Sequence, residues 1–114
     1  MLRESANETN RPLDVRAVAD PGVDPLLPGG SALVSLVNAA VKGGADEIVA
    51  AGRRVRASLG SAALADTAAV IGNFEMMNRV AHGTGIPVGR GARLANADLI
   101  ATLGLDRFDH AEAR

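Results

Sequence analysis

The stretch of sequence that decides the fold is AALADTAAVIGNFEMMNRVAH, which occupies residues 62–82. It contains no proline, and its apolar residues recur at the three- and four-residue spacing of a helix face. Val70, Met77 and Val80 extend the apolar surface well beyond a narrow stripe. A helix that is apolar around so much of its circumference is either central to its fold or shared with another chain. The expected principal row is Leu64, Ala68, Ile71, Phe74, Asn78 and Ala81.

Two shorter helical patterns precede this stretch. The first begins at Ser31, the expected N-cap, and ends at Gly43, where a left-handed cap is expected. Asp46 is expected to cap the second helix, which Gly60 ends. Helical periodicity predicts the inward-facing residues of both helices. These are Leu33, Leu36, Val37, Ala40 and Val41 in the first, and Ile48, Gly52, Val55 and Leu59 in the second.

The two ends of the chain carry weaker patterns. Pro87 prevents any continuation of the long helix, residues 89–93 are predicted as a link, and a short helix is expected over 97–103. Prolines at positions 12, 21, 25 and 28 interrupt residues 1–30, whose apolar groups fit an arm packed on a neighbour or a partly disordered leader. We therefore predict an all-α fold: a small helical bundle of three main helices plus a short C-terminal helix. An irregular N-terminal arm at 1–30 precedes a single helical domain at 31–114.

Composition excludes several classes of function. The chain of 114 residues has 12 basic and 13 acidic residues and only 2% aromatic residues, which disfavours nucleic-acid binding. It has no cysteine, and therefore no disulfide, thiolate metal site or cysteine nucleophile. His82 and His110 are far apart and form no metal-binding motif, and the glycine pairs lack the strand and lysine of a phosphate loop. We expect no metal and no cofactor.

Location and origin follow from the same composition. No stretch of 18 apolar residues exists and residues 1–10 lack an apolar signal core, so we expect a cytoplasmic protein that does not contact membranes. Lys42 is the only lysine among the 12 basic residues, and alanine and glycine are abundant. This usage indicates a GC-rich bacterial genome.

One polar row stands out within residues 62–82. Glu75, Asn78, Arg79 and His82 lie along one side of the predicted helix, where Glu75 can pair with Arg79 and Asn78 with His82. A carboxylate and an imidazole two turns apart can also exchange protons with a substrate. Glu75 and His82 are therefore candidate acid and base groups, with Arg79 as a clamp for a carboxylate. No nucleophile, metal or cofactor signal accompanies the row, which favours structural pairs over catalysis.

Further motifs flank and occupy this stretch. They are Val55-Arg-x-x-Leu59-Gly60, Ala63-Leu64-x-x-x-Ala68-Ala69-Val70, Gly72-Asn-Phe74, Asn78-Arg79-Val80-Ala81 and Thr84-Gly-Ile-Pro87. Together they resemble the C-terminal half of the carboxymuconolactone decarboxylase and alkylhydroperoxidase D-like family over about residues 31–88. The resemblance implies a helical architecture and assembly into dimers, trimers or hexamers. The catalytic Cys-x-x-Cys half of that family has no counterpart in this chain, and no catalytic residue of the family maps onto it.

Two functions fit these observations. The first is a non-catalytic helical domain that forms homo-oligomers or binds a protein partner, which includes one subunit of a split enzyme whose other chain carries the catalytic half. The second is a small cofactor-independent lyase or isomerase acting on a small organic acid, with Glu75 and His82 as acid and base. The absence of a cysteine, metal or cofactor motif favours the first function.

Overall fold

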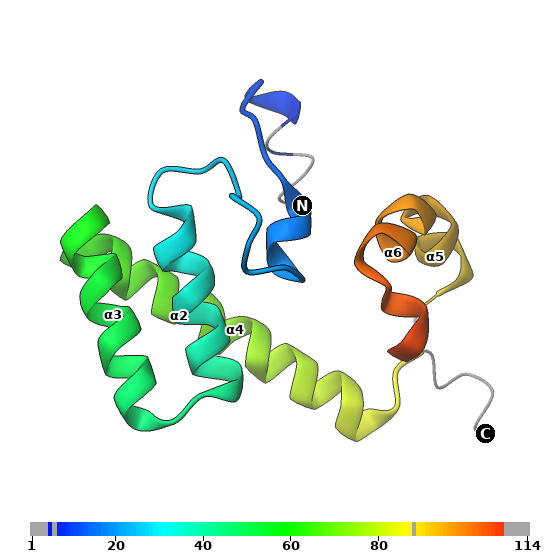
Figure 1. Cartoon of the computed structure of the whole chain (residues 1–114). Coiled ribbons are helices and arrows are strands. Elements are labelled where there is room, and N and C mark those ends of the chain that lie inside the picture. Colours follow the sequence, from blue (N-terminus) through cyan, green and yellow to red (C-terminus); the bar gives the residue numbers. More distant parts are fainter. Residues whose placement is uncertain (1–4, 6, 88, 109–114) are drawn as a thin grey trace. The chain divides into compact units, whose positions relative to one another are not determined.

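The computed structural model describes residue 5 and the ranges 7–87 and 89–108. Its main helices are α2 (Gly30–Lys42), α3 (Ala45–Leu59) and α4 (Ser61–Thr84), followed by the short α5 (Arg90–Ala95) and α6 (Ala97–Leu103) (Figure 1). Two 3-10 turns, η1 (Val15–Val18) and η2 (Leu105–Phe108), lie near the ends. The described ranges contain no strand, so the prediction of a small all-α bundle is confirmed.

The chain divides into two compact units, Met1–Met76 and Met77–Arg114, and α4 continues from the first into the second. Within the described ranges, no helix combines the length and the apolar character needed to cross a membrane.

The core of the first unit lies between α2 and α3, which run side by side in Figure 1. Leu36 of α2 is 4% exposed, and Ala51 and Val55 of α3 are completely buried. Leu64 and Ile71 add the first part of α4 to this cluster. The core therefore contains few large side chains, and each of them makes a large part of its packing contacts. Replacing one of them is expected to lower stability clearly.

The buried face of α2 is rotated from the predicted one. Val37 is 42% and Val41 49% exposed, so the prediction that they face inward is wrong. Ala32 and Ala39 pack against the core in their place. Nearly every position of α2 is apolar or small, so several helical rows fit its sequence, and the alanines permit the closer approach of α3.

The face of α3 was predicted more accurately. Gly52 and Val55 are buried as expected, and Leu59 is half-buried. Ile48 is 39% exposed, however, and Ala51 is buried in the core. The helix therefore presents its smaller side chains to α2 and leaves Ile48 at the edge of the contact.

The predicted caps of α2 and α3 are wrong in detail. Gly29 precedes α2 in a left-handed conformation (φ 64°), which places Ser31 inside the helix, and Gly43 is extended (φ −90°, ψ 175°). Glu47 takes the capping role expected of Asp46, because its carboxylate accepts a hydrogen bond from the backbone N–H of Gly44 at 2.7 Å. The glycines therefore mark the helix ends. The carboxylate that accepts from the N–H of Gly44 is that of Glu47, one residue after the predicted cap Asp46.

The described part of the N-terminal arm packs within the first unit. Ala17 and Pro25 are buried, and the backbone N–H of Asp14 donates to the carbonyl of Pro25 at 3.2 Å. A Cβ atom at Gly30 would overlap the Pro25 ring, so the arm requires glycine at the start of α2. These contacts agree with an arm packed on a neighbour, and the choice between the two alternatives for the arm stays a prediction. Residues 1–4 and 6 lie outside the described ranges.

In the second unit, the short C-terminal helix was predicted with the correct bounds. α6 covers Ala97–Leu103, and Gly104 ends it in a left-handed conformation (φ 62°). The predicted link at 89–93 is wrong, because Arg90–Ala95 form α5. The amide of Asn96 donates to the carbonyl of Ala92 at 2.8 Å and does not cap α6. His110 and the rest of the tail after residue 108 lie outside the described ranges.

Replacing Val55 with alanine is expected to lower the free energy of unfolding by about 2 kcal/mol, because it leaves a cavity in the small core. The matched control is Val49→Ala in the same helix, since Val49 is 52% exposed. This control is expected to change stability by less than about 0.5 kcal/mol. Urea unfolding followed by circular dichroism at one protein concentration compares the two. Equal losses would contradict the position of the core.

The ion pair of the arm gives a prediction about pH. The side chain of Arg16 donates to both carboxylate oxygens of Asp14, at 2.6 Å for the shortest contact. These hydrogen bonds lower the pKa of Asp14. Because the pKa of Asp14 is lower in the folded than in the unfolded state, the ion pair stabilises the arm fully at pH values above the unfolded-state pKa. This stabilisation is lost as the pH falls through the folded-state pKa. Carboxyl NMR titration is expected to show a higher Asp14 midpoint in Arg16→Gln and no change in Arg11→Gln. An unchanged midpoint in Arg16→Gln would contradict the pairing.

Candidate functional site

The first unit has an apolar groove of about 470 Å³ between α2, α3 and the first part of α4. Its wall contains nine apolar residues or glycines and two arginines. This volume lies within the range of about 300–1,000 Å³ that is typical of small-molecule sites. The wall consists of Leu36, Ala40, Ile48, Val49, Gly52, Arg53, Arg56, Leu64, Ala68, Ile71 and Gly72.

Small residues create this hollow. Two glycines and two alanines contribute to the wall, so the helices meet without large side chains to fill the space between them. A Cβ atom at Gly52 would stand 3.7 Å from Leu64 Cδ1, an ordinary contact distance. A Cβ atom at Gly72 would meet nothing within 4 Å. The space beside Gly72 is therefore more open than the space beside Gly52.

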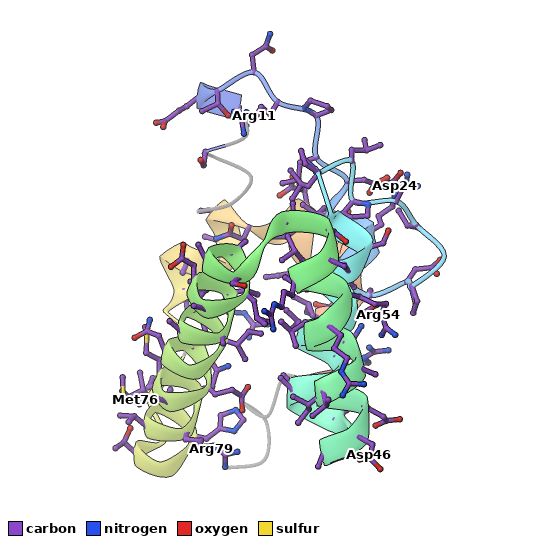
Figure 2. The ribbon with its side chains drawn as sticks, turned by 90° about the vertical axis from the view of Figure 1, so that its left-hand side faces the viewer. Arg11, Asp24, Asp46, Arg54, Met76 and Arg79 are labelled. Carbon is purple, nitrogen blue, oxygen red and sulfur yellow. The ribbon has the colours of Figure 1, made fainter. Side chains whose placement is uncertain are left out.

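Arg53 and Arg56 are the two charged residues of the groove wall. Their spacing of three residues places them on the same side of α3, whereas Arg54 lies about 100° away around the helix. Arg54 contributes instead to grooves along α2, and Figure 2 shows it pointing away from α4. The sequence alone did not indicate this groove. The available signal was the pair of arginines beside the inward row of α3, which is also explained by the favourable position of cations near a helix C-terminus.

The second notable surface is that of α4. None of its 24 residues is buried, and Val70, Phe74 and Met76 are 56%, 47% and 57% exposed. In Figure 2, Met76 points away from α3. Within the first unit, α4 therefore exposes large apolar side chains on the sides that do not contact the core.

The polar row predicted on α4 is largely exposed. Glu75 is half-buried, while Asn78, Arg79 and His82 are exposed. The hydrogen bond predicted between Asn78 and His82 is not among those that the described residues form. The Glu75–Arg79 pair stays a prediction. None of the grooves described above includes these residues in its wall, so the geometry shows no enclosed place for a substrate beside them.

Metal chemistry finds no support in the described ranges, which contain no group of three or more His, Asp or Glu residues placed to hold an ion. The described ranges do contain an apolar groove with two cations in its wall, and a helix, α4, with exposed apolar side chains.

The exposure of His82 generates a prediction for the row. Because the imidazole is exposed, His82→Ala is expected to change the free energy of unfolding by no more than about 0.5 kcal/mol. Thermal unfolding at fixed protein concentration measures this, with the wild-type chain as reference and Val55→Ala as the destabilised comparison. If the free energy of unfolding fell by more than about 1 kcal/mol, His82 would support the end of α4, as the predicted pairing with Asn78 requires.

Comparison of the chain with models of protein families, with curated proteins and with solved structures finds no match. The resemblance to the carboxymuconolactone decarboxylase and alkylhydroperoxidase D-like family therefore stays a prediction from the motifs.

Proposed function

We propose that this chain is a non-catalytic helical domain that forms a homo-oligomer, and that α4 makes the contact with the second copy. The observation that carries the proposal is the exposure of α4. A helix of 24 residues without one buried residue is unusual in a chain whose buried hydrophobic residues number four in the described ranges. Exposed large apolar side chains such as Val70, Phe74 and Met76 are typical of interaction sites in soluble proteins when a partner covers them.

The spacing of small residues on α4 supports a helix as the partner. One exposed row follows the alternating three- and four-residue spacing of a coiled-coil seam. Its alanines and its glycine allow the backbone of a second helix to approach closely. In the isolated chain, Gly72 has open space beside it and costs about 1 kcal/mol relative to alanine. A close helix contact would offset that cost. We name this row the α4 seam; it consists of Ala62, Ala65, Ala69, Gly72 and Met76.

A second copy is the simplest partner for the α4 seam. A two-fold contact between identical chains places the same residues on both sides, so a seam of small residues meets another of the same kind. The motif resemblance implies oligomers as well. A different protein that carries a catalytic half is the alternative partner, and the assembly state of the purified chain distinguishes the two.

The first expected result concerns the mass of the purified chain. Light scattering at micromolar concentration is expected to give at least twice the chain mass of 11.6 kDa. Met76→Glu is expected to weaken self-association at least tenfold, because it places a charge in an apolar contact. The helix itself is expected to form as before, since residue 76 is exposed in the single chain and glutamate is a good helix former.

The matched control is Val37→Glu, which places the same charge on a valine of α2 that is 42% exposed. It is expected to leave the measured mass unchanged. Circular dichroism of both variants checks that they fold. A wild-type mass near 11.6 kDa would contradict the homo-oligomer, and equal effects of the two variants would contradict the assignment to α4.

A further inference from the structure

We propose that the groove between α2, α3 and α4 binds one fatty carboxylate, with its chain on the apolar wall and its carboxylate held by Arg53 and Arg56. This inference goes beyond the proposed homo-oligomer. It rests on the composition and charge of the groove, and it concerns a ligand-binding activity of each single chain.

The apolar part of the wall selects the body of the ligand. Leu36, Ile48, Val49, Leu64 and Ile71 surround the hollow, and the groove offers almost no neutral polar group. A hydrocarbon chain that enters it exchanges contact with water for contact with these side chains, which is favourable in proportion to the apolar area removed from water. A hydrophilic ligand would lose its hydration and receive few hydrogen bonds in return.

The two arginines select the head group. Arg53 and Arg56 bring two positive charges into the wall, and no aspartate or glutamate contributes to it. Guanidinium groups form strong bidentate hydrogen bonds with a carboxylate. Arg56 also lies in the last turn of α3. An apolar body with one anionic end is therefore the ligand class that matches both parts of the groove.

The size of the groove restricts the occupant further. About 470 Å³ is small-molecule volume, whereas a helix with its side chains is about 10–12 Å across and needs a longer trough. The groove does not include Met76, but it meets the α4 seam at Gly72, which belongs to both. A free fatty carboxylate fits this space better than a helix of a partner protein.

The experiment is isothermal titration calorimetry of the full chain with sodium dodecanoate below its critical micelle concentration. Calorimetry is chosen because the chain has no tryptophan or tyrosine to report binding by fluorescence. Dodecyltrimethylammonium provides the same tail with a cationic head, and acetate provides the head without the tail. The expected result is saturable binding of one dodecanoate per chain, at least tenfold tighter than the binding of either control compound.

Variants then test the site. Arg53→Gln combined with Arg56→Gln is expected to weaken dodecanoate binding at least tenfold. The matched control, Arg54→Gln, removes the same charge from the same helix outside this groove and is expected to change affinity less than twofold. All three arginines are exposed, so the variants are expected to fold, which circular dichroism checks.

Three results would overturn the inference: no saturable binding of dodecanoate, equal binding of the cationic compound, or equal effects of the arginine pair and of Arg54→Gln. Light scattering in the same buffer reports the assembly state separately. A failure of dodecanoate binding is thereby distinguished from a failure of the homo-oligomer, because each has its own readout.

Discussion

The contact between α2 and α3 is the interaction on which the rest of the structure depends. Ala51 and Val55 of α3 are completely buried against Leu36 of α2, and Leu64 and Ile71 of α4 pack against this cluster. Because the contacting residues are small, the helices approach closely but remove little apolar area from water per residue. A core of this kind holds α3 firmly against α2 but covers little of the surface of α4. The exposed surface of α4 and the hollow beside Gly52 follow from the same choice of small side chains.

Local signals predicted the elements, and tertiary packing decided their faces. Gly60 and Gly104 end α3 and α6 in conformations that favour glycine, so these boundaries could be predicted from the residues alone. The buried row of α2 could not be, because Val37 and Ala39 fit helical periodicity equally well and only the approach of α3 distinguishes them. The helix at 90–95 was missed because two glycines and two arginines dominate the local signal. The apolar residues of α4 could be predicted from the sequence, but their exposure could not, because it depends on how little of this helix the small core covers.

The candidate sites show the same division. Spacing alone placed Glu75 and His82 on α4, but only the fold shows that His82 is exposed and that neither residue contributes to a described groove. Conversely, the groove combines residues of three helices, and its existence depends on where those helices converge. The positions of Arg53 and Arg56 on one side of α3 follow from their spacing. Their spacing does not reveal that this side of α3 borders a hollow instead of bulk water. The hollow depends on Gly72 and Ala68, and their small size is equally compatible with a close helix contact.

A chain with a small core gains stability from whatever covers its apolar surface. Binding to the folded state at a hundred times the dissociation constant adds about 2.7 kcal/mol, which is comparable to the loss expected from one large cavity in a core. Self-association through the α4 seam and ligand binding in the groove both have this effect, but they depend on different concentrations. Stabilisation by a second copy rises with protein concentration, and stabilisation by a fatty carboxylate rises with ligand concentration. The groove and the seam share Gly72, but Arg53 and Arg56 belong to α3 and Met76 is not part of the groove wall. Each contribution can therefore be weakened by its own substitution, and the two together determine how stable the fold is under working conditions.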